Sequence, residues 1–328
     1  MKAARRPGPF YLGVDGGGAK TVALLGDADA LIVGAGRAGN SCIYRAGSAS
    51  DAIDEICGAV SQACGSAGVS PDEIAVAALA LAGADWPEDF DYLEVQLRRR
   101  LLARGELLIL NDVFGALRAG TDTAVGTCVV GGTGANIGAQ GPDGSRWYAS
   151  FWLPVPSGAR GMAWSGVFAA VRDELGLGPR TSLTERVREF FGVSSVEGVL
   201  HAFTRRDPRP DMELAPFAVV VMNEAAAGDP AATQVVTDLG HRFGEYVRVA
   251  AGRVGLTADY PLVLAGGLFR HESDLLHDAV ASMAPGSVAR RASHEPAVGA
   301  LLLALDRVAP PRPAAAVRGL PPPGFFVA

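Results

Sequence analysis

A glycine-rich segment near the N-terminus, Gly13–Thr21, surrounds three consecutive glycines with an acid, a lysine and a threonine. It lies between two short apolar runs, so it predicts a turn between two strands. That context excludes the dinucleotide-binding fingerprint, which needs a helix after the glycines, and the spacing excludes the G-x-x-x-x-G-K-[ST] loop. Such a turn can present backbone N–H groups to phosphate oxygens, to which Lys20 would add a cation and Thr21 a hydroxyl.

The acid of this segment, Asp15, ends the first apolar run. We expect it to face a bound Mg²⁺ through water, because Mg²⁺ keeps much of its hydration shell. The alternative is an ordinary tight hairpin, in which Asp15 and the glycines serve only the turn.

Two further glycine-rich turns follow. Gly131–Gly134 opens a second run of strands as the first turn opens the first run, and two such turns at matching places can hold a triphosphate from both sides. Leu262–Phe269 runs from a buried strand into Gly266 and Gly267 before a helix. Glycines there let an adenine or ribose approach the backbone closely, and the alternative is a helix-entry turn that needs open backbone angles.

An acid also follows the apolar strand at residues 107–110, in the pair Asn111-Asp112. A carboxylate at a strand end can accept the proton of a substrate hydroxyl as that hydroxyl attacks a γ-phosphate. Asp112 is therefore the candidate general base. The alternative is that Asp112 only caps the helix beginning at Val113, although the two roles are not exclusive.

The order of elements places these segments in two repeats. The first repeat reads β-β-β-α-β-α-β-α, and the second begins again with three strands and contains a helical insertion. This order predicts an α/β protein with a duplicated fold, two lobes and an interlobe cleft. The predicted strands are 11–14, 21–25, 31–35, 74–80, 107–110, 124–130, 135–140, 146–149, 261–265 and 287–290, and the predicted helices are 48–67, 89–103, 113–119 and 297–308.

The chain divides accordingly. We expect a flexible N-terminal segment at residues 1–9 and a first lobe at 10–120, closed by the C-terminal helix 297–308. A second lobe at 121–296 carries the helical insertion, which we expect between about Met162 and Val254. The proline-rich tail at 309–328 is predicted to run extended and flexible over the surface.

Composition sets the broad class. The chain has 328 residues, 49% of them hydrophobic and 20% charged, which is typical of a soluble globular protein and not of a disordered one. The net charge of −6 argues against nucleic acid as a partner, and no apolar run is long enough for a signal peptide or a membrane helix, so we expect a cytoplasmic protein with no membrane partner. None of the four cysteines forms a C-x-x-C pair, which indicates buried structural thiols.

Together these motifs, over about residues 11–306, resemble the BadF/BadG/BcrA/BcrD ATPase family, whose sugar-active members are N-acetylglucosamine and glucosamine kinases. The resemblance implies the duplicated ribonuclease H-like fold of the actin-like ATPases, the use of ATP and Mg²⁺, and a homodimer. It implies that Asp112 is the catalytic aspartate and that Asp15 faces the metal. The nucleotide-binding residues that it implies are Asp15, Gly17, Gly18, Lys20, Thr21, Gly132, Thr133, Gly134, Gly228, Gly266 and Gly267. The candidate substrate-binding residues are Asn40, Gly83, Asn111, Asp112 and Trp152, together with Arg160, which departs from the family pattern.

The chain also departs from the family pattern. Ala19 stands where relatives usually have threonine, and the second glycine turn lacks the flanking serines. After Trp152, an acidic pair that binds sugar hydroxyls in relatives is replaced by Ala159-Arg160. The sugar pocket is therefore altered, which predicts that N-acetylglucosamine is a poor acceptor. An arginine there would suit a sugar that bears a carboxylate or phosphate. The alternative is that Arg160 points to solvent and that the loop has only been remodelled.

Three functions remain open at this level. The first is an ATP-dependent kinase that phosphorylates a hydroxyl of a sugar or aminosugar. The second is an ATPase that activates a partner enzyme, as the family's dehydratase activators do with an iron–sulfur cluster held by cysteines. The third is a degenerate nucleotide-binding regulatory protein, motivated by the lost hydroxyls and the lost acidic pair.

Overall fold

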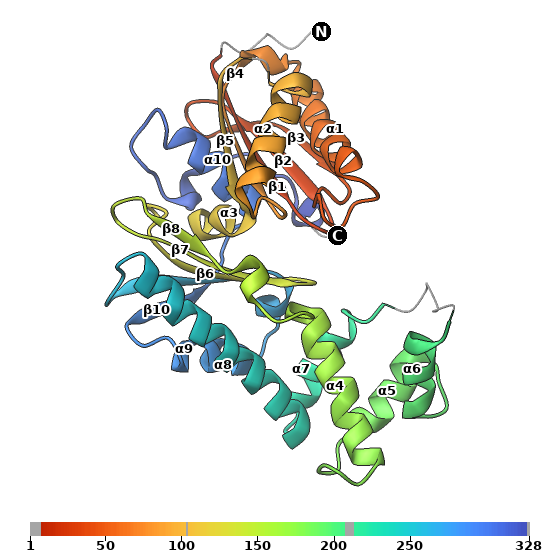
Figure 1. Ribbon diagram of the computed structural model, residues 1–328. Helices are drawn as coiled ribbons and strands as arrows, with labels where there is room; N and C mark the ends of the chain where they lie inside the picture. The colour runs from red at the N-terminus through yellow and green to blue at the C-terminus, as the bar shows by residue number, and fades with distance from the viewer. Residues whose placement is uncertain (1–7, 103, 207–212, 327–328) are drawn as a thin grey trace. The chain divides into compact units, whose positions relative to one another are not determined.

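The computed structural model describes residues 8–102, 104–206 and 213–326, and these contain two five-stranded sheets (Figure 1). The first sheet has the order β3-β2-β1-β4-β5, and the second has the order β8-β7-β6-β9-β10 when it is followed in the same sense. The two orders are the same if each repeat is counted from its own first strand. The predicted duplicated α/β fold is therefore confirmed.

The first sheet begins as an antiparallel meander and continues with parallel strands. Strand β1 pairs with β2 in antiparallel fashion, and β4 runs parallel to both β1 and β5. Strand β4 is apolar and buried along almost its whole length, as expected for a central strand covered on both faces. The strands are β1 (Phe10–Gly16), β2 (Thr21–Gly26), β3 (Ile32–Ala38), β4 (Ile74–Leu81) and β5 (Glu106–Asn111).

Four helices pack with this sheet: α1 (Ala49–Ala67), α2 (Pro87–Arg100), α3 (Asp112–Ala119) and α10 (Pro296–Leu305). Helix α1 buries Ile53, Ile56 and Val60 at helical spacing, and Ser48 caps it by accepting from the Asp51 N–H. Helix α10 is apolar on all sides and packs against β1, β4 and α3. A side chain at Gly299 would meet the Gly115 carbonyl oxygen at 1.9 Å, so only glycine allows this close approach.

The second sheet and its helices repeat the pattern with an insertion. The strands are β6 (Gly126–Gly131), β7 (Ala135–Gln140), β8 (Arg146–Tyr148), β9 (Tyr260–Ala265) and β10 (Ser287–Arg291), and a short helix α9 (Leu275–Ser282) lies between the last two. The insertion consists of α4 (Gly158–Glu174), α5 (Leu183–Phe191), α6 (Val196–Thr204), α7 (Phe217–Ala226) and α8 (Pro230–Arg253). Aromatic rings hold its helices together; for example, Phe191 packs on both Phe203 and Phe217 with centroids 5.3–5.8 Å apart.

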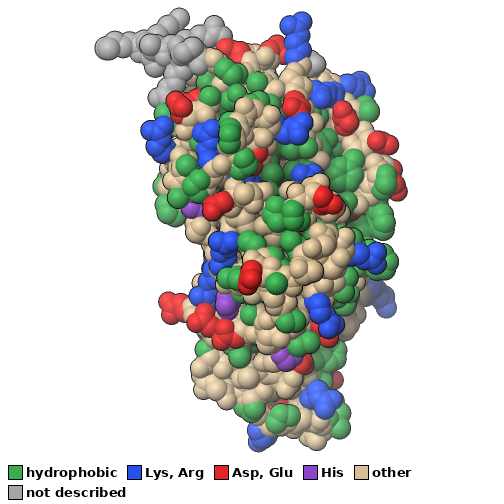
Figure 2. Space-filling view, turned by 90° about the vertical axis from the view of Figure 1, so that its left-hand side faces the viewer, with side chains coloured by type: hydrophobic (Ala, Val, Ile, Leu, Met, Phe, Trp, Pro, Cys, Tyr) green, Lys and Arg blue, Asp and Glu red, His purple; other side chains and the backbone are tan. Residues whose placement is uncertain are grey.

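The described chain forms two compact units. The first takes the described residues within 1–128, 138–148 and 292–328, and the second takes those within 129–137 and 149–291. The predicted N-terminal segment, residues 1–9, lies mostly outside the described residues. Among the described helices, none combines the length and apolar character needed to cross a membrane. On the face drawn in Figure 2, acidic and basic side chains are interspersed with apolar ones.

The proline-rich tail differs from the extended run that we expected. As far as residue 326, it packs on the first unit: the Arg318 N–H donates to the Ala30 carbonyl, and the Ile32 N–H donates to the Arg318 carbonyl. Two short 3₁₀ turns interrupt it, and Ala314, Val317 and Phe326 are buried. Burial of these apolar side chains stabilises the docked conformation over an extended one.

Candidate functional site

The first glycine turn is the hairpin that joins β1 to β2. Inside the turn the Gly17 N–H donates to the Lys20 carbonyl at 2.9 Å, and Gly18 and Ala19 form its exposed tip. Two further backbone bonds fix the hairpin from outside, since the Ala82 N–H donates to the Gly16 carbonyl and the Ser41 N–H donates to the Gly17 carbonyl. The turn is therefore held by the end of β4 and by the loop after β3.

We expected the Thr21 hydroxyl to contact phosphate, but in the structure it bonds to the backbone of the loop after β3. Its side chain is fully buried, and its hydroxyl donates to the Gly39 carbonyl at 2.7 Å. This bond holds the loop that carries Asn40. The Asn40 side-chain oxygen in turn accepts from the Cys42 N–H at 2.9 Å, so this loop is built around side chain–backbone bonds.

Two other carboxyl groups, those of Asp112 and Glu295, act on the charge of Asp15. Burial, together with the nearby charges of Asp112 and Glu295, raises the pKa of Asp15 to about 7, and the Lys20 ammonium acts in the opposite direction. The three acids and Lys20 belong to the first unit. A divalent cation beside Asp15 would relieve this accumulation of negative charge, so the chemistry of these residues fits Mg²⁺.

The protein ligands for such an ion are few. Among the described residues, no group of three or more His, Cys, Asp or Glu is arranged to hold a metal ion. A Mg²⁺ ion held by one carboxylate, by water and by phosphate oxygens agrees with that arrangement.

The cap of helix α3 is Asn111 and not Asp112. The Asn111 side-chain oxygen accepts from the Val113 N–H at 3.3 Å, and Asp112 is the first residue of the helix itself. The interpretation of Asp112 as only an N-cap is therefore wrong. Adjacent Asn and Asp are equally good caps, so the sequence does not separate them.

Asn111 also has partners that sequence reasoning missed. Its amide nitrogen donates to the Asp85 carboxylate at 2.9 Å and to the Ala84 carbonyl at 3.2 Å. Asp85 comes from the loop after β4, two residues beyond Gly83, and no motif marks it. Gly83 packs against the loop that follows Asn40, because a side chain there would meet Ile43 at 3.1 Å and the Cys42 Sγ at 3.5 Å. The structure thus brings together Asn40, Gly83, Asn111 and Asp112 with Asp85 in one unit.

Ser41 is a second residue that the sequence does not mark. Its hydroxyl is buried and lacks a hydrogen-bond partner within the described part of the chain. A side chain added at Gly16 would meet this oxygen at 2.6 Å, so the hydroxyl lies directly against the first glycine turn.

The second glycine turn is packed against the start of α4. The turn is closed by a bond from the Gly132 N–H to the Gly134 carbonyl, and Thr133 forms its exposed tip. Gly158 has a φ of +62°, and a side chain there would meet the Gly134 carbonyl oxygen at 2.1 Å. Glycine is therefore required at Gly158 both for its backbone angle and for space.

Ala159 and Arg160, which we predicted to line a sugar loop, belong to the first turn of α4. The Ala159 N–H donates to the Gly132 carbonyl, and the Arg160 N–H donates to the Thr133 carbonyl. The helical insertion therefore begins at Gly158, four residues before the predicted start. The Arg160 side chain is exposed.

The third segment that we predicted to bind nucleotide, Leu262–Phe269, packs against the second glycine turn. Gly266 has a φ of +93°, and a side chain there would meet the Gly131 carbonyl oxygen at 2.5 Å. Gly267 follows it as the first residue of a 3₁₀ turn. The second unit thus brings Gly266 and Gly267 next to the hairpin of Gly132, Thr133 and Gly134.

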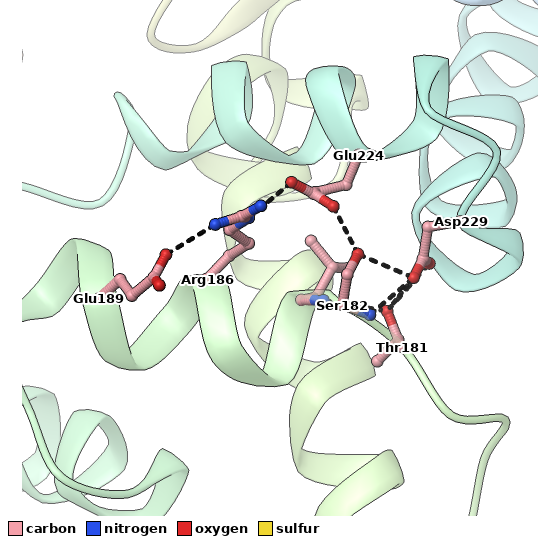
Figure 3. Close-up of polar contacts among 7 residues, drawn as sticks. Thr181, Ser182, Arg186, Glu189, Glu224 and Asp229 are labelled. Carbon is pink, nitrogen blue, oxygen red and sulfur yellow. Dashed lines mark hydrogen bonds and ion pairs between the residues drawn. The ribbon is translucent and has the colours of Figure 1, made fainter.

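Gly228 lies apart from these glycines along the chain, between α7 and α8, with a φ of +92° and open space where a side chain would be. The next residue, Asp229, caps α8 through the Ala232 N–H and accepts from the hydroxyls of Thr181 and Ser182 (Figure 3). Glu224 extends this network by accepting from Ser182 and Arg186. These polar groups bond to one another, so the network stabilises the insertion.

Trp152 is 70% exposed, and its carbonyl accepts from the Tyr246 hydroxyl. Its neighbours Phe151 and Val155 are also exposed. The exposed side chains of this loop are therefore largely apolar.

The comparisons with known proteins fit this architecture. The model of the BadF/BadG/BcrA/BcrD ATPase family matches residues 12–304. A proposed N-acetylglucosamine kinase from Chromobacterium violaceum is 23% identical, with 90% of this chain and 98% of that chain covered and a TM-score of 0.70.

Two further solved structures share the fold. A proposed N-acetylglucosamine kinase from Porphyromonas gingivalis is 20% identical, with 90% and 99% covered and a TM-score of 0.64. A glucokinase of the ROK family from Streptomyces griseus, solved with glucose and AMPPNP, is 17% identical, with 90% and 99% covered and a TM-score of 0.56. No curated protein matches the chain.

Proposed function

The chain belongs to the BadF/BadG/BcrA/BcrD ATPase family, and we propose that it is an ATP-dependent kinase that phosphorylates a hydroxyl of a sugar or aminosugar. The observation that carries the proposal is the grouping of Asp112, Asp15 and Lys20 beside the first glycine turn. A base, a candidate metal ligand and a cation in one neighbourhood are the groups that phosphoryl transfer requires.

In the proposed reaction, the substrate hydroxyl oxygen attacks the γ-phosphorus of ATP. A new O–P bond forms, the bond between the γ-phosphorus and the bridging oxygen breaks, and ADP leaves. Asp112 accepts the proton of the attacking hydroxyl. The turns at Gly17–Gly18 and Gly132–Gly134 and the glycines Gly266 and Gly267 would bind the nucleotide, while Asn40, Gly83 and Asn111 would orient the acceptor.

The proposed metal site is at Asp15. When bound, Mg²⁺ would neutralise charge on the phosphate oxygens. Asp15 would hold the ion through its water ligands, and Lys20 would keep the phosphate end of the nucleotide close to it. Both residues lie at the β1–β2 hairpin, which is fixed by backbone bonds.

The activator function has less support. It needs thiols that can hold an iron–sulfur cluster, but Cys42, Cys64 and Cys128 are buried and Cys57 is half-buried. Burial also raises the pKa of Cys64 to about 11 and that of Cys128 above its usual value. Buried, protonated thiols are poor ligands for a cluster.

The proposed function is tested by replacing the base. Asp112→Asn removes proton acceptance and leaves the cap at Asn111 in place, so kcat should fall on the order of 10²-fold or more. The dissociation constant of a non-hydrolysable ATP analogue, measured by calorimetry, should change little. Asp122→Asn, at an exposed acid, is the matched control. Turnover by Asp112→Asn equal to that of the wild type would exclude this role.

A further inference from the structure

The loop after β4 carries a carboxylate, Asp85, that is aimed at the residue before the proposed base. One oxygen of Asp85 accepts from the Asn111 amide nitrogen at 2.9 Å. The other end of that amide accepts from the Val113 N–H at 3.3 Å and so caps α3. Asp112 lies between the two bonded residues, as the first residue of the helix.

Asp85 is itself held in place on both sides. Its N–H donates to the Asp89 carboxylate at 3.2 Å, and its carbonyl accepts from the Tyr148 hydroxyl at 2.9 Å. Asp89 is nearly fully buried and also accepts from the Tyr44 hydroxyl and the Trp86 N–H. The backbone of Asp85 is therefore fixed by the start of α2 and by Tyr148 of β8, and Tyr44 in turn fixes the carboxylate of Asp89.

The orientation of the Asn111 amide decides whether α3 is capped. A side-chain amide can rotate by 180°, and only one orientation directs its oxygen toward the Val113 N–H. The opposite end of the amide donates to the Asp85 carboxylate at 2.9 Å and to the Ala84 carbonyl at 3.2 Å. Both acceptors favour that orientation, and the carboxylate favours it more strongly because it is charged. A charge-assisted bond of this kind is also stronger than a bond between neutral groups.

We propose that Asp85 is a positioning residue for the base: through Asn111 it fixes the first turn of α3 and with it the carboxylate of Asp112. This inference rests on the proposed function for its catalytic consequence. Its structural part, the ordering of the start of α3 by Asp85, does not depend on which acceptor the protein uses.

The experiment compares Asp85→Ala, Asp85→Asn and the control Asp91→Ala, whose residue is exposed on α2. In Asp85→Ala, kcat should fall roughly 10- to 100-fold, because small displacements of a catalytic group are costly, while the KM for ATP stays within about twofold. Asp85→Asn keeps an oxygen that can accept from Asn111, so it should return kcat to within about threefold of the wild type. Asp91→Ala should leave kcat unchanged.

Hydrogen exchange at the start of α3 provides a readout without turnover. The Val113 amide should exchange several-fold faster in Asp85→Ala than in the wild type or Asp91→Ala, and Asp85→Asn should restore it. If the wild type phosphorylates no acceptor, the proposed function fails. The exchange measurement still tests whether Asp85 orders the start of α3 through Asn111.

Three results would overturn the inference. The first is unchanged kcat in Asp85→Ala. The second is unchanged exchange at Val113. The third is an Asp85→Asn variant as impaired as Asp85→Ala with a raised KM for the acceptor, which would mean that the charge of Asp85 contacts the substrate directly.

Discussion

At the scale of single residues, Asp15 lies where its negative charge is disfavoured. Its pKa is raised to about 7 by burial and by the charges of Asp112 and Glu295, against 3.8 for the unperturbed group. The folded protein therefore binds a proton more tightly than the unfolded chain does. Ionisation of Asp15 opposes folding, and the loss of stability begins above pH 3.8 and is complete above about pH 7.

We predict that Asp15→Asn stabilises the protein without Mg²⁺ and nucleotide, and that the gain grows from pH 4 to pH 8. A difference of about three pKa units corresponds to roughly 4 kcal/mol, which is an upper bound for the gain at pH 8. Urea unfolding at both pH values measures it, with Asp29→Asn in the exposed β2–β3 turn as control. A gain that is equal at both pH values would contradict the assignment of the effect to charge.

Nucleotide binding in the presence of Mg²⁺ should weaken in the variant whose stability rises. The same Asp15→Asn variant should lose the Mg²⁺-dependent tightening of nucleotide binding, because a neutral amide attracts a hydrated cation less than a carboxylate does. An acid whose charge destabilises the fold is more easily explained by function than by structure.

At the scale of elements, helix α3 is fixed at both ends by different means. Asn111 caps its start, and at its end the fully buried Arg118 donates to the Asp306 carboxylate at 2.7 Å and 3.1 Å. The same guanidinium donates to the carbonyls of Thr121 and Arg312. Arg118 therefore joins α3 to the residue after α10 and to the proline-rich tail.

We predict that Arg118→Ala lowers the free energy of unfolding by about 3–5 kcal/mol, since it leaves a carboxylate and two carbonyls without their donor. Arg307→Ala is the matched control, because the Arg307–Glu106 pair is largely exposed and should contribute little. Denaturant titration of both variants and the wild type measures the free energies of unfolding to be compared. Equal, small losses would show that the buried network is not needed for stability.

The elements themselves were largely predictable from the sequence, and the long-range contacts were not. The strands, the helices of the first unit and the glycine turns follow from local periodicity and turn residues, so their order was predicted correctly. The start of α4 at Gly158 was missed, because its segment of prolines and glycines has no helical periodicity. The bond from Asn111 to Asp85 spans 26 residues and leaves no local signal. Thr21 was misassigned for the same reason, since its partner Gly39 lies 18 residues away.

At the scale of the whole molecule, each repeat contributes one glycine hairpin between its first two strands. The hairpins differ in what surrounds them. The first lies among Asp15, Asp112 and Glu295, whereas the second is bonded to the start of α4. The repeats have therefore kept the same strand order while the chemistry around their turns has diverged, and the proposed acid–base chemistry belongs to the first repeat.

The charge around the base also bears on which acceptor fits. Burial raises the pKa of Cys42, and the charges of Asp85 and Asp112 raise it further. The pKa of Tyr44 is raised by burial, by its bond to Asp89 and by the charges of Asp89, Asp85 and Glu88. Asp85 and Asp112 therefore contribute negative charge near Cys42, which the nearby Arg45 guanidinium partly offsets. From the sequence we predicted the opposite preference, because Arg160 stands where the family pattern has an acid, and Arg160 is exposed on the first turn of α4. The two predictions differ in the charge of the preferred acceptor, so kinetics with matched acceptors separates them.

We predict that, among hexosamines matched in size, neutral and amine-bearing acceptors are phosphorylated with a kcat/KM at least about tenfold higher than anionic ones. Bringing an anion close to several carboxylates costs on the order of 1 kcal/mol for each pair at short range, even where solvent screens the charges. The measurement is kcat/KM for the three acceptors at low and high salt, for the wild type and Arg160→Ala. High salt should narrow the difference, because it screens repulsion between charges. An anionic acceptor that is preferred by the wild type and lost in Arg160→Ala would instead establish Arg160 as the residue that selects the substrate.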